Sequence, residues 1–187
     1  MENYEYQLKI PKERLGVLIG TDGEIKKKIE EETHTEIRVD SREGEVSVSG
    51  TDALTLLTAR EIIKAIARGF NPDIAMLLLK HDYGLEILSI KDYAKTSNDE
   101  IRLKGRVIGK EGKSRRIIET ITECYISVYG KTLSIIGESE NLAVARKAVD
   151  SLLKGSPHSR VFRWLEMQRK QLKDREFFDS MKTQEVK

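Results

Sequence analysis

The chain has 187 residues, of which 34% are charged and 39% are hydrophobic, and its formal net charge is +2. This length suits one or two small domains, and the small net charge means that any surface attracting a polyanion must be local. The single cysteine, Cys124, excludes an internal disulfide and favours a reducing cytoplasm. The apolar run at residues 75–79 is far shorter than the ~20 residues that cross a membrane, and the first residues lack a signal peptide's pattern.

The first 70 residues predict one α+β domain with the order β-α-α-β-β-α. The expected elements are a strand at 4–10, helices at 13–19 and 24–33, a hairpin of strands at 36–39 and 45–48, and a long helix capped by Thr51 or Asp52 and ending at Arg68. Gly69 ends the long helix, because glycine readily adopts the conformation that terminates helices.

Residues 71–84 predict a packed connector between two domains. Asn71, Pro72 and Asp73 have the capping and proline chemistry that begins a helix, and a short apolar helix is expected at 74–80. Because the segment is apolar and lacks a Ser/Gly tract, we do not expect a flexible linker.

Residues 85–155 predict a second domain of the same kind. The expected elements are a strand at 85–90, a helical turn at 92–96, a helix capped by Asn98 or Asp99 and ending at Val107, a helix at 113–122, a hairpin of strands at 125–128 and 132–136, and a helix capped by Ser139 over 140–153. Residues 156–187 predict a basic helix, at 159–178, and a frayed polar tail.

A glycine pattern occurs at matching places in the two domains. Gly16, Gly20, Gly23 and Ile29 recur 89 residues later as Gly105, Gly109, Gly112 and Ile118. Glycine lets the backbone approach a ligand closely, and a helix that begins after such a turn directs free N–H groups at an anion. One turn of this kind is weak evidence, but a repeated pattern of glycine and aliphatic residues is far more specific.

The two copies differ in local charge. Residues 102–116 contain seven basic residues and one acidic residue, a net charge of +6, whereas residues 13–27 contain three of each. Asp22 lies inside the first turn, where it would repel a phosphate. We therefore expect the second turn to be the main polyanion site, and the first to bind weakly or to serve as an interaction surface.

The repeated motifs resemble those of paired type I KH domains. They are Ile19-Gly20-Thr21-Asp22-Gly23 and Ile108-Gly109-Lys110-Glu111-Gly112, each followed by an aliphatic helix, a hairpin and a long helix. The segment at residues 66–72, the second motif and Gly155-Ser156-Pro157 also resemble the archaeal relatives of a KH-domain small-subunit ribosome assembly factor called "partner of Nob".

This second resemblance implies a function as well as a fold. Members of that family bind ribosomal RNA near the 3′ end of the small-subunit precursor and assist its maturation without being nucleases. The resemblance also implies a partner endonuclease and contact with the alpha subunit of translation initiation factor two.

A KH domain clamps about four nucleotides of single-stranded RNA by their backbone at the glycine turn. For the second copy, the residues expected to admit the phosphates, supply charge or form the apolar floor are Arg106, Ile108, Gly109, Lys110, Glu111, Gly112, Lys113, Arg115, Arg116, Ile126 and Val128. The weaker first-copy site comprises Gly20, Thr21, Asp22, Gly23, Lys26 and Lys27.

Other interpretations stay open from the sequence alone. The KH fold could serve as a protein–protein adaptor that binds RNA only incidentally. A metal-dependent nuclease is less favoured, because neither the histidines nor Cys124 have metal-ligand spacing and no carboxylates form a catalytic motif, so we expect no enzyme, metal or cofactor. Tyr129 is expected to be exposed.

Four basic residues of the last helix could contact RNA, solvent or another domain: Arg160, Arg163, Arg169 and Lys170.

Overall fold

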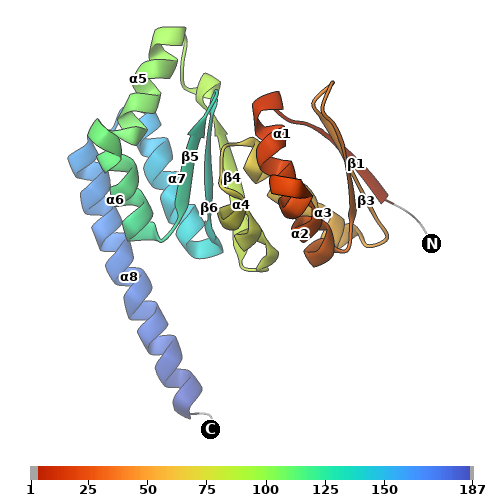
Figure 1. Ribbon diagram of the computed structural model, residues 1–187. Helices are drawn as coiled ribbons and strands as arrows, with labels where there is room; N and C mark the ends of the chain where they lie inside the picture. The colour runs from red at the N-terminus through yellow and green to blue at the C-terminus, as the bar shows by residue number, and fades with distance from the viewer. Residues whose placement is uncertain (1–3, 186–187) are drawn as a thin grey trace.

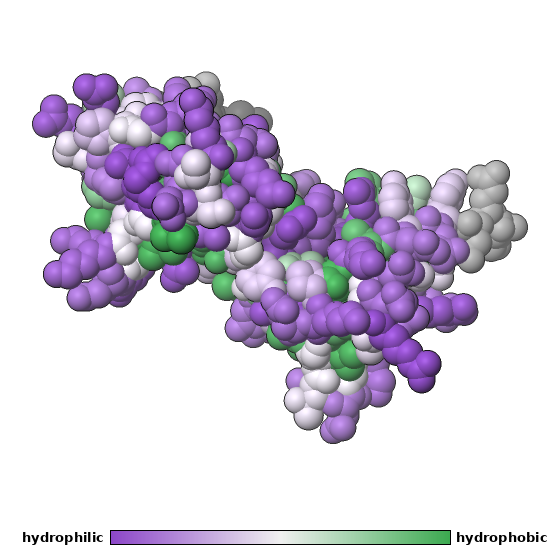
Figure 2. Space-filling view, turned by 90° about the horizontal axis from the view of Figure 1, so that it is seen from above, coloured by the Kyte–Doolittle hydropathy of each residue, from purple (hydrophilic) through white to green (hydrophobic). Residues whose placement is uncertain are grey.

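The computed structural model describes the backbone of residues 4–185 and the side chains of residues 4–171. It contains two α+β domains side by side, and a long C-terminal helix projects from the second domain (Figure 1). Each domain has a sheet of three antiparallel strands, in the order β1-β3-β2 or β4-β6-β5. The predicted order β-α-α-β-β-α and the C-terminal helix are therefore confirmed. Seen from above, two lobes with a mostly hydrophilic surface meet at a narrower waist (Figure 2).

The first domain follows the expected order closely. Its elements are β1 (Tyr4–Lys9), α1 (Lys12–Ile19), the 3₁₀ turn η1 (Thr21–Gly23), α2 (Glu24–Thr33), β2 (Glu36–Asp40), β3 (Glu45–Gly50) and α3 (Ala53–Ala67). Asp52 caps α3, because its carboxylate accepts hydrogen bonds from the backbone N–H groups of Leu54 and Thr55. Alternate residues of β2 and β3 turn inward, so that Ile37, Val46 and Val48 join the core beneath the helices.

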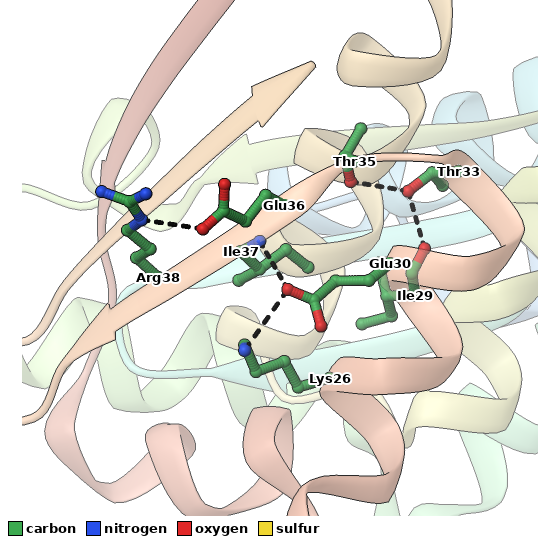
Figure 3. A network of polar contacts seen from close by, with 8 residues as sticks. All are labelled: Lys26, Ile29, Glu30, Thr33, Thr35, Glu36, Ile37 and Arg38. Carbon is green, nitrogen blue, oxygen red and sulfur yellow. Dashed lines mark hydrogen bonds and ion pairs between the residues drawn. The ribbon is translucent and has the colours of Figure 1, made fainter.

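Polar contacts tie α2 to the edge strand β2 (Figure 3). Glu30 Oε1 accepts a hydrogen bond from the backbone N–H of Ile37 at 2.7 Å and lies 3.3 Å from Lys26 Nζ. Glu119 makes the same contact in the second domain, where its Oε1 lies 2.8 Å from the backbone N of Ile126. In both domains, a helix carboxylate thus occupies a backbone donor that an edge strand would otherwise leave unpaired.

The segment after α3 packs against the first core. The single helix expected at 74–80 is wrong in detail: α4 (Pro72–Ala75) begins earlier, with Pro72 in the first turn, and continues as the 3₁₀ helix η2 (Met76–Leu79). Ala75 and Leu78 are buried, and the other apolar side chains of η2 pack against the same core.

The second domain repeats the first with small differences. Its elements are β4 (Tyr83–Ser89), the 3₁₀ turn η3 (Ile90–Asp92), α5 (Ser97–Ile108), the 3₁₀ turn η4 (Lys110–Gly112), α6 (Lys113–Thr122), β5 (Tyr125–Tyr129), β6 (Thr132–Glu138) and α7 (Ser139–Leu153).

Two predicted helix caps in this domain are wrong. Thr96 caps α5 instead of Asn98 or Asp99, because its hydroxyl accepts the hydrogen bond of the Asp99 N–H at 3.2 Å. Ser139 does not cap α7, because it is the first residue of that helix and its hydroxyl donates to the backbone carbonyl of Asp82 at 3.0 Å.

The last helix, α8 (His158–Glu185), packs against α6 and α7 and buries Val161 and Leu165. The prediction of a helix ending at 178 with a frayed tail is wrong, because the helix continues to Glu185. No helix between residues 4 and 185 combines the length and apolar character that crossing a membrane requires.

The first domain covers the outer face of the second sheet. Ile136 of β6 is fully buried and belongs to the hydrophobic core of the first domain. Ser127 Oγ donates to the backbone carbonyl of Arg68 at 2.8 Å, and the Tyr129 hydroxyl donates to the Glu13 carboxylate. The expectation of an exposed Tyr129 is therefore wrong: the ring is half-buried, and the guanidinium carbon of Arg14 lies 5.9 Å from its centre.

Candidate nucleic-acid interface

The second glycine turn joins α5 to α6 and lies on the surface. Gly109, Glu111 and Gly112 all have positive φ angles, and Lys110 and Glu111 are exposed. A Cβ atom on Gly109 would lie 2.6 Å from Ser114 Cβ and 2.7 Å from Ser114 N, so only glycine fits there. The turn therefore brings bare backbone and the first N–H groups of α6 to solvent, which is a favourable environment for an anion.

Two hollows flank α6. The first, which we name the β5 groove, lies between α6 and β5 and has a volume of about 370 Å³. Arg115 and Glu119 of α6 line one side and the residues of β5 line another. The first domain and the connector contribute the remaining lining: Arg14, Gly69 and Phe70 from the first domain, and Asn71 and Ile74 from the connector. This groove is thus built by both domains.

The second hollow, which we name the α8 groove, lies between the glycine turn, α6 and α8. Its volume is about 690 Å³. Its lining residues are Lys110, Glu111, Lys113, Arg116, Ile117, Thr120, Ile121, Glu166 and Arg169. Helix α6, which follows the exposed turn, therefore has a groove on each side, and the turn itself lines the α8 groove.

The residues predicted for the second-copy site divide between these hollows. Lys110, Glu111, Lys113 and Arg116 line the α8 groove, whereas Arg115, Ile126 and Val128 line the β5 groove. Ile126 is only 4% exposed and belongs to the core, and Val128 packs against that core, so both chiefly support the groove from below. Ile108 is half-buried at the end of α5.

Arg106 lies elsewhere than the sequence suggested. Its guanidinium donates to the backbone carbonyls of Leu152 at 3.0 Å and Ser156 at 2.6 Å, which ties α5 to the end of α7. Arg14 does the same in the first domain, with bonds to the carbonyls of Ile66 and Phe70. The two arginines are 92 residues apart, whereas the glycine pattern repeats after 89 residues, so the sequence repeat did not show that they are equivalent.

Several of the basic side chains around the turn have internal partners. Arg102 Nη2 lies 3.0 Å from Asp99 Oδ1, and the hydrogen bond from Arg102 holds the pKa of that carboxyl below its usual range. Arg115 Nε lies 3.6 Å from Glu119 Oε2, and Arg116 donates to the backbone carbonyl of Glu111. Lys110 and Lys113 form no ion pair with any acid among residues 4–171, so their charge is available to a ligand.

The first glycine turn has the same backbone but a different charge. Gly20, Asp22 and Gly23 have φ angles of 74°, 53° and 80°, close to those of Gly109, Glu111 and Gly112. Thr21 and Asp22 are exposed. Lys26 is half-buried beside Glu30, which leaves Lys27 as the exposed cation of the predicted set. The repeat thus preserves the turn and not its electropositive surroundings.

Sequence reasoning missed the contribution of the first domain to the β5 groove. Arg14 and the residues after α3 reach the second domain only through tertiary packing, and no spacing in the sequence indicates that contact. The hydrogen bond to Glu13 and partial burial raise the pKa of Tyr129, which shows how closely the two domains meet here.

Comparison with known proteins identifies the family. Residues 5–65 match the KH domain family, and residues 84–170 match the second-domain PNO1 family, described as "Eukaryotic type KH-domain (KH-domain type I)". The KH domain-containing protein MJ0443 of Methanocaldococcus jannaschii is 48% identical over 174 residues, which cover 91% of this chain and 76% of that protein. The chain belongs to the PNO1 family of KH-domain proteins.

More distant members of the PNO1 family carry functional names. Pre-rRNA-processing protein PNO1 of Coccidioides immitis is 32% identical over 131 residues, which are 69% of this chain and 51% of that protein, so this chain spans about half the length of such curated relatives. A chain in the crystal structure of the a/eIF2alpha-aDim2p-rRNA complex from Pyrococcus horikoshii is 42% identical, with a TM-score of 0.84, over 90% of this chain and 96% of that one.

Proposed function

We propose that this protein binds single-stranded ribosomal RNA during maturation of the small ribosomal subunit. The observation that carries the proposal is the exposed, electropositive turn at residues 109–112 followed by a helix, α6, that has the β5 groove along one side. Its membership of the PNO1 family supports the same function, because relatives are named as pre-rRNA-processing proteins and one similar chain was crystallised with rRNA.

In this proposal the glycine turn and the β5 groove contact different parts of the RNA. The backbone of the turn and the first N–H groups of α6 receive a phosphate, and the free charges of Lys110 and Lys113 attract it. The adjoining bases lie over the β5 groove, where Arg115, Glu119 and the polar groups of Ser127 and Asn71 offer donors and acceptors to base edges.

The finer details of the function extend this proposal. The resemblance to the assembly-factor family leads us to expect a target near the 3′ end of the small-subunit rRNA. We also propose the alpha subunit of translation initiation factor two as a partner, and the complex of the Pyrococcus relative, which contains rRNA and a/eIF2alpha, supports this partner. A maturation endonuclease is the expected catalytic partner in the cytoplasm, and this protein acts as the binding component. Within the described residues, no three His, Cys, Asp or Glu side chains are grouped as metal ligands.

Replacement of both Lys110 and Glu111 by Asp tests the RNA site. Aspartate tolerates the left-handed backbone of position 111, so the turn is retained while two negative charges face the phosphate. We expect affinity for single-stranded RNA to fall at least about tenfold, and the salt dependence of binding to become shallower. Fluorescence anisotropy with a labelled RNA at several salt concentrations measures both quantities.

The first domain provides the matched control. Thr21→Asp creates the same Asp-Asp pair in the first turn, since Asp22 is already present, and we expect less than about a twofold loss of affinity. Unchanged binding by the Lys110 and Glu111 variant, with its circular dichroism intact, would exclude the second turn as the site. Weak binding that never saturates in the wild type would instead indicate a protein adaptor.

A further inference from the structure

The α8 groove is lined by several basic side chains that form no ion pair within the described part of the chain. Among residues 4–171, Lys110, Lys113, Arg116 and Arg169 line it together with two acids, Glu111 and Glu166, so this part of the lining has a net charge of +2. None of the four cations forms an ion pair with an acid among residues 4–171. Arg116 does donate to the backbone carbonyl of Glu111, which leaves Lys110, Lys113 and Arg169 as the described cations of the groove with the fewest internal partners. Both arginines that line the β5 groove are engaged: Arg14 with backbone carbonyls and Arg115 with Glu119.

The groove is continuous with the proposed RNA site. Lys110 and Glu111 form the centre of the glycine turn and also the mouth of the α8 groove. Ile117, Thr120 and Ile121 of α6 form its wall, and α8 supplies Glu166 and Arg169 from the opposite side. A polyanion held at the turn can therefore continue along α6 without leaving a surface of positive potential.

We propose that the α8 groove binds the sugar-phosphate backbone of the same RNA strand where it continues beyond the nucleotides held at the glycine turn. This inference rests on the proposed function and extends it to a longer footprint. The volume of about 690 Å³ and the free cations suit phosphates, which need charge rather than a fitted pocket for each base. Among residues 4–171, Arg169 is the cation that α8 contributes to this groove, and α8 contributes to neither the turn nor the β5 groove.

Binding of two RNA lengths to an Arg169→Glu variant tests the proposal. The probes are labelled mixed-sequence RNAs of about five nucleotides, enough for the KH site alone, and of about twelve nucleotides, long enough to enter the groove. We expect Arg169→Glu to weaken binding of the longer RNA about tenfold and to reduce its salt dependence, while the shorter RNA changes less than about twofold. Arg169→Ala should show a smaller loss in the same direction.

Arg163→Glu is the matched control. Arg163 is an exposed arginine of the same helix that lines neither groove, so its reversal makes the same change in net charge. Equal effects of the two reversals, or no effect of Arg169→Glu on the longer RNA, would overturn the proposal and leave the groove to a different ligand such as an acidic protein segment. If the wild type bound neither RNA saturably, the proposed function itself would fail. Circular dichroism and thermal melting verify that each variant is folded.

Discussion

Gly109 and Gly112 both have positive φ angles, 73° and 76°, but they differ in ψ, which is 175° and 11°, and in the space around them. A Cβ on Gly109 would overlap the backbone of Ser114. Ser114 is buried in the first turn of α6, so moving it away would disturb the packing of that helix. A Cβ on Gly112 would meet nothing closer than the Arg116 side chain at 3.7 Å. The first glycine is thus demanded by packing and by backbone conformation, and the second by conformation alone.

Alanine substitution should separate these two requirements. We expect Gly112→Ala to lower the free energy of unfolding by about 1–2 kcal/mol, the cost of a left-handed residue with a side chain. Gly109→Ala adds a steric clash and should lower it further, by a total of more than about 2 kcal/mol. Urea denaturation followed by circular dichroism measures both values. Equal midpoints for the two variants would show that the contact with Ser114 relaxes freely.

At the scale of elements, an arginine on the first helix of each domain is bonded to the end of the third helix. Arg14 and Arg106 each donate two hydrogen bonds, one to a backbone carbonyl in the last turn of that helix and one to a carbonyl three residues beyond it. In the second domain, His158 Nε2 also lies 2.8 Å from the Arg106 carbonyl, so the junction includes the start of α8. This junction sets the position of α8 and therefore of the α8 groove.

Arg106→Lys tests whether this residue is structural or binds RNA. Lysine keeps the charge but lacks the forked guanidinium that spans both carbonyls, so we expect the free energy of unfolding to fall by about 1–3 kcal/mol. RNA affinity measured well below the unfolding midpoint should change little. A stable variant with greatly weakened RNA binding would instead favour the direct RNA contact that the sequence suggested.

Much of the order of the secondary-structure elements was predictable, because it depends on local periodicity. The alternation at residues 36–39 and 45–48 predicted β2 and β3, and the repeated glycine pattern predicted both turns. The cap of α5 was not predictable, because several neighbouring Ser, Thr, Asn and Asp side chains compete for the same role. Helix α7 has no side-chain cap, and Ser139 bonds instead to the carbonyl of Asp82, a tertiary contact that no local pattern indicates. The two grooves were not predictable either, since Arg14 and Arg169 come to line them beside α6 only through tertiary packing.

At the scale of the whole molecule, the second sheet is covered on both faces. Helices α5, α6 and α7 pack on one face, and the connector and α3 of the first domain pack near the other (Figure 1). Strand β6 is accordingly buried without interruption from Leu133 to Gly137, whereas β3 of the first domain alternates. The two KH domains therefore share apolar core and should behave as one cooperative unit.

Ile136→Ala tests this cooperativity, because Ile136 lies in the second domain but is packed into the core of the first. Removal of a fully buried isoleucine side chain should lower the free energy of unfolding by about 2–5 kcal/mol. Trp164 fluorescence reports on the second domain and far-UV circular dichroism on the whole chain, so both transitions should shift together and remain coincident. Leu57→Ala, at a side chain that is 42% exposed, should cost much less. If circular dichroism became biphasic while the Trp164 transition stayed in place, the domains would be independent, and the β5 groove that they build together would not be a fixed feature of the molecule.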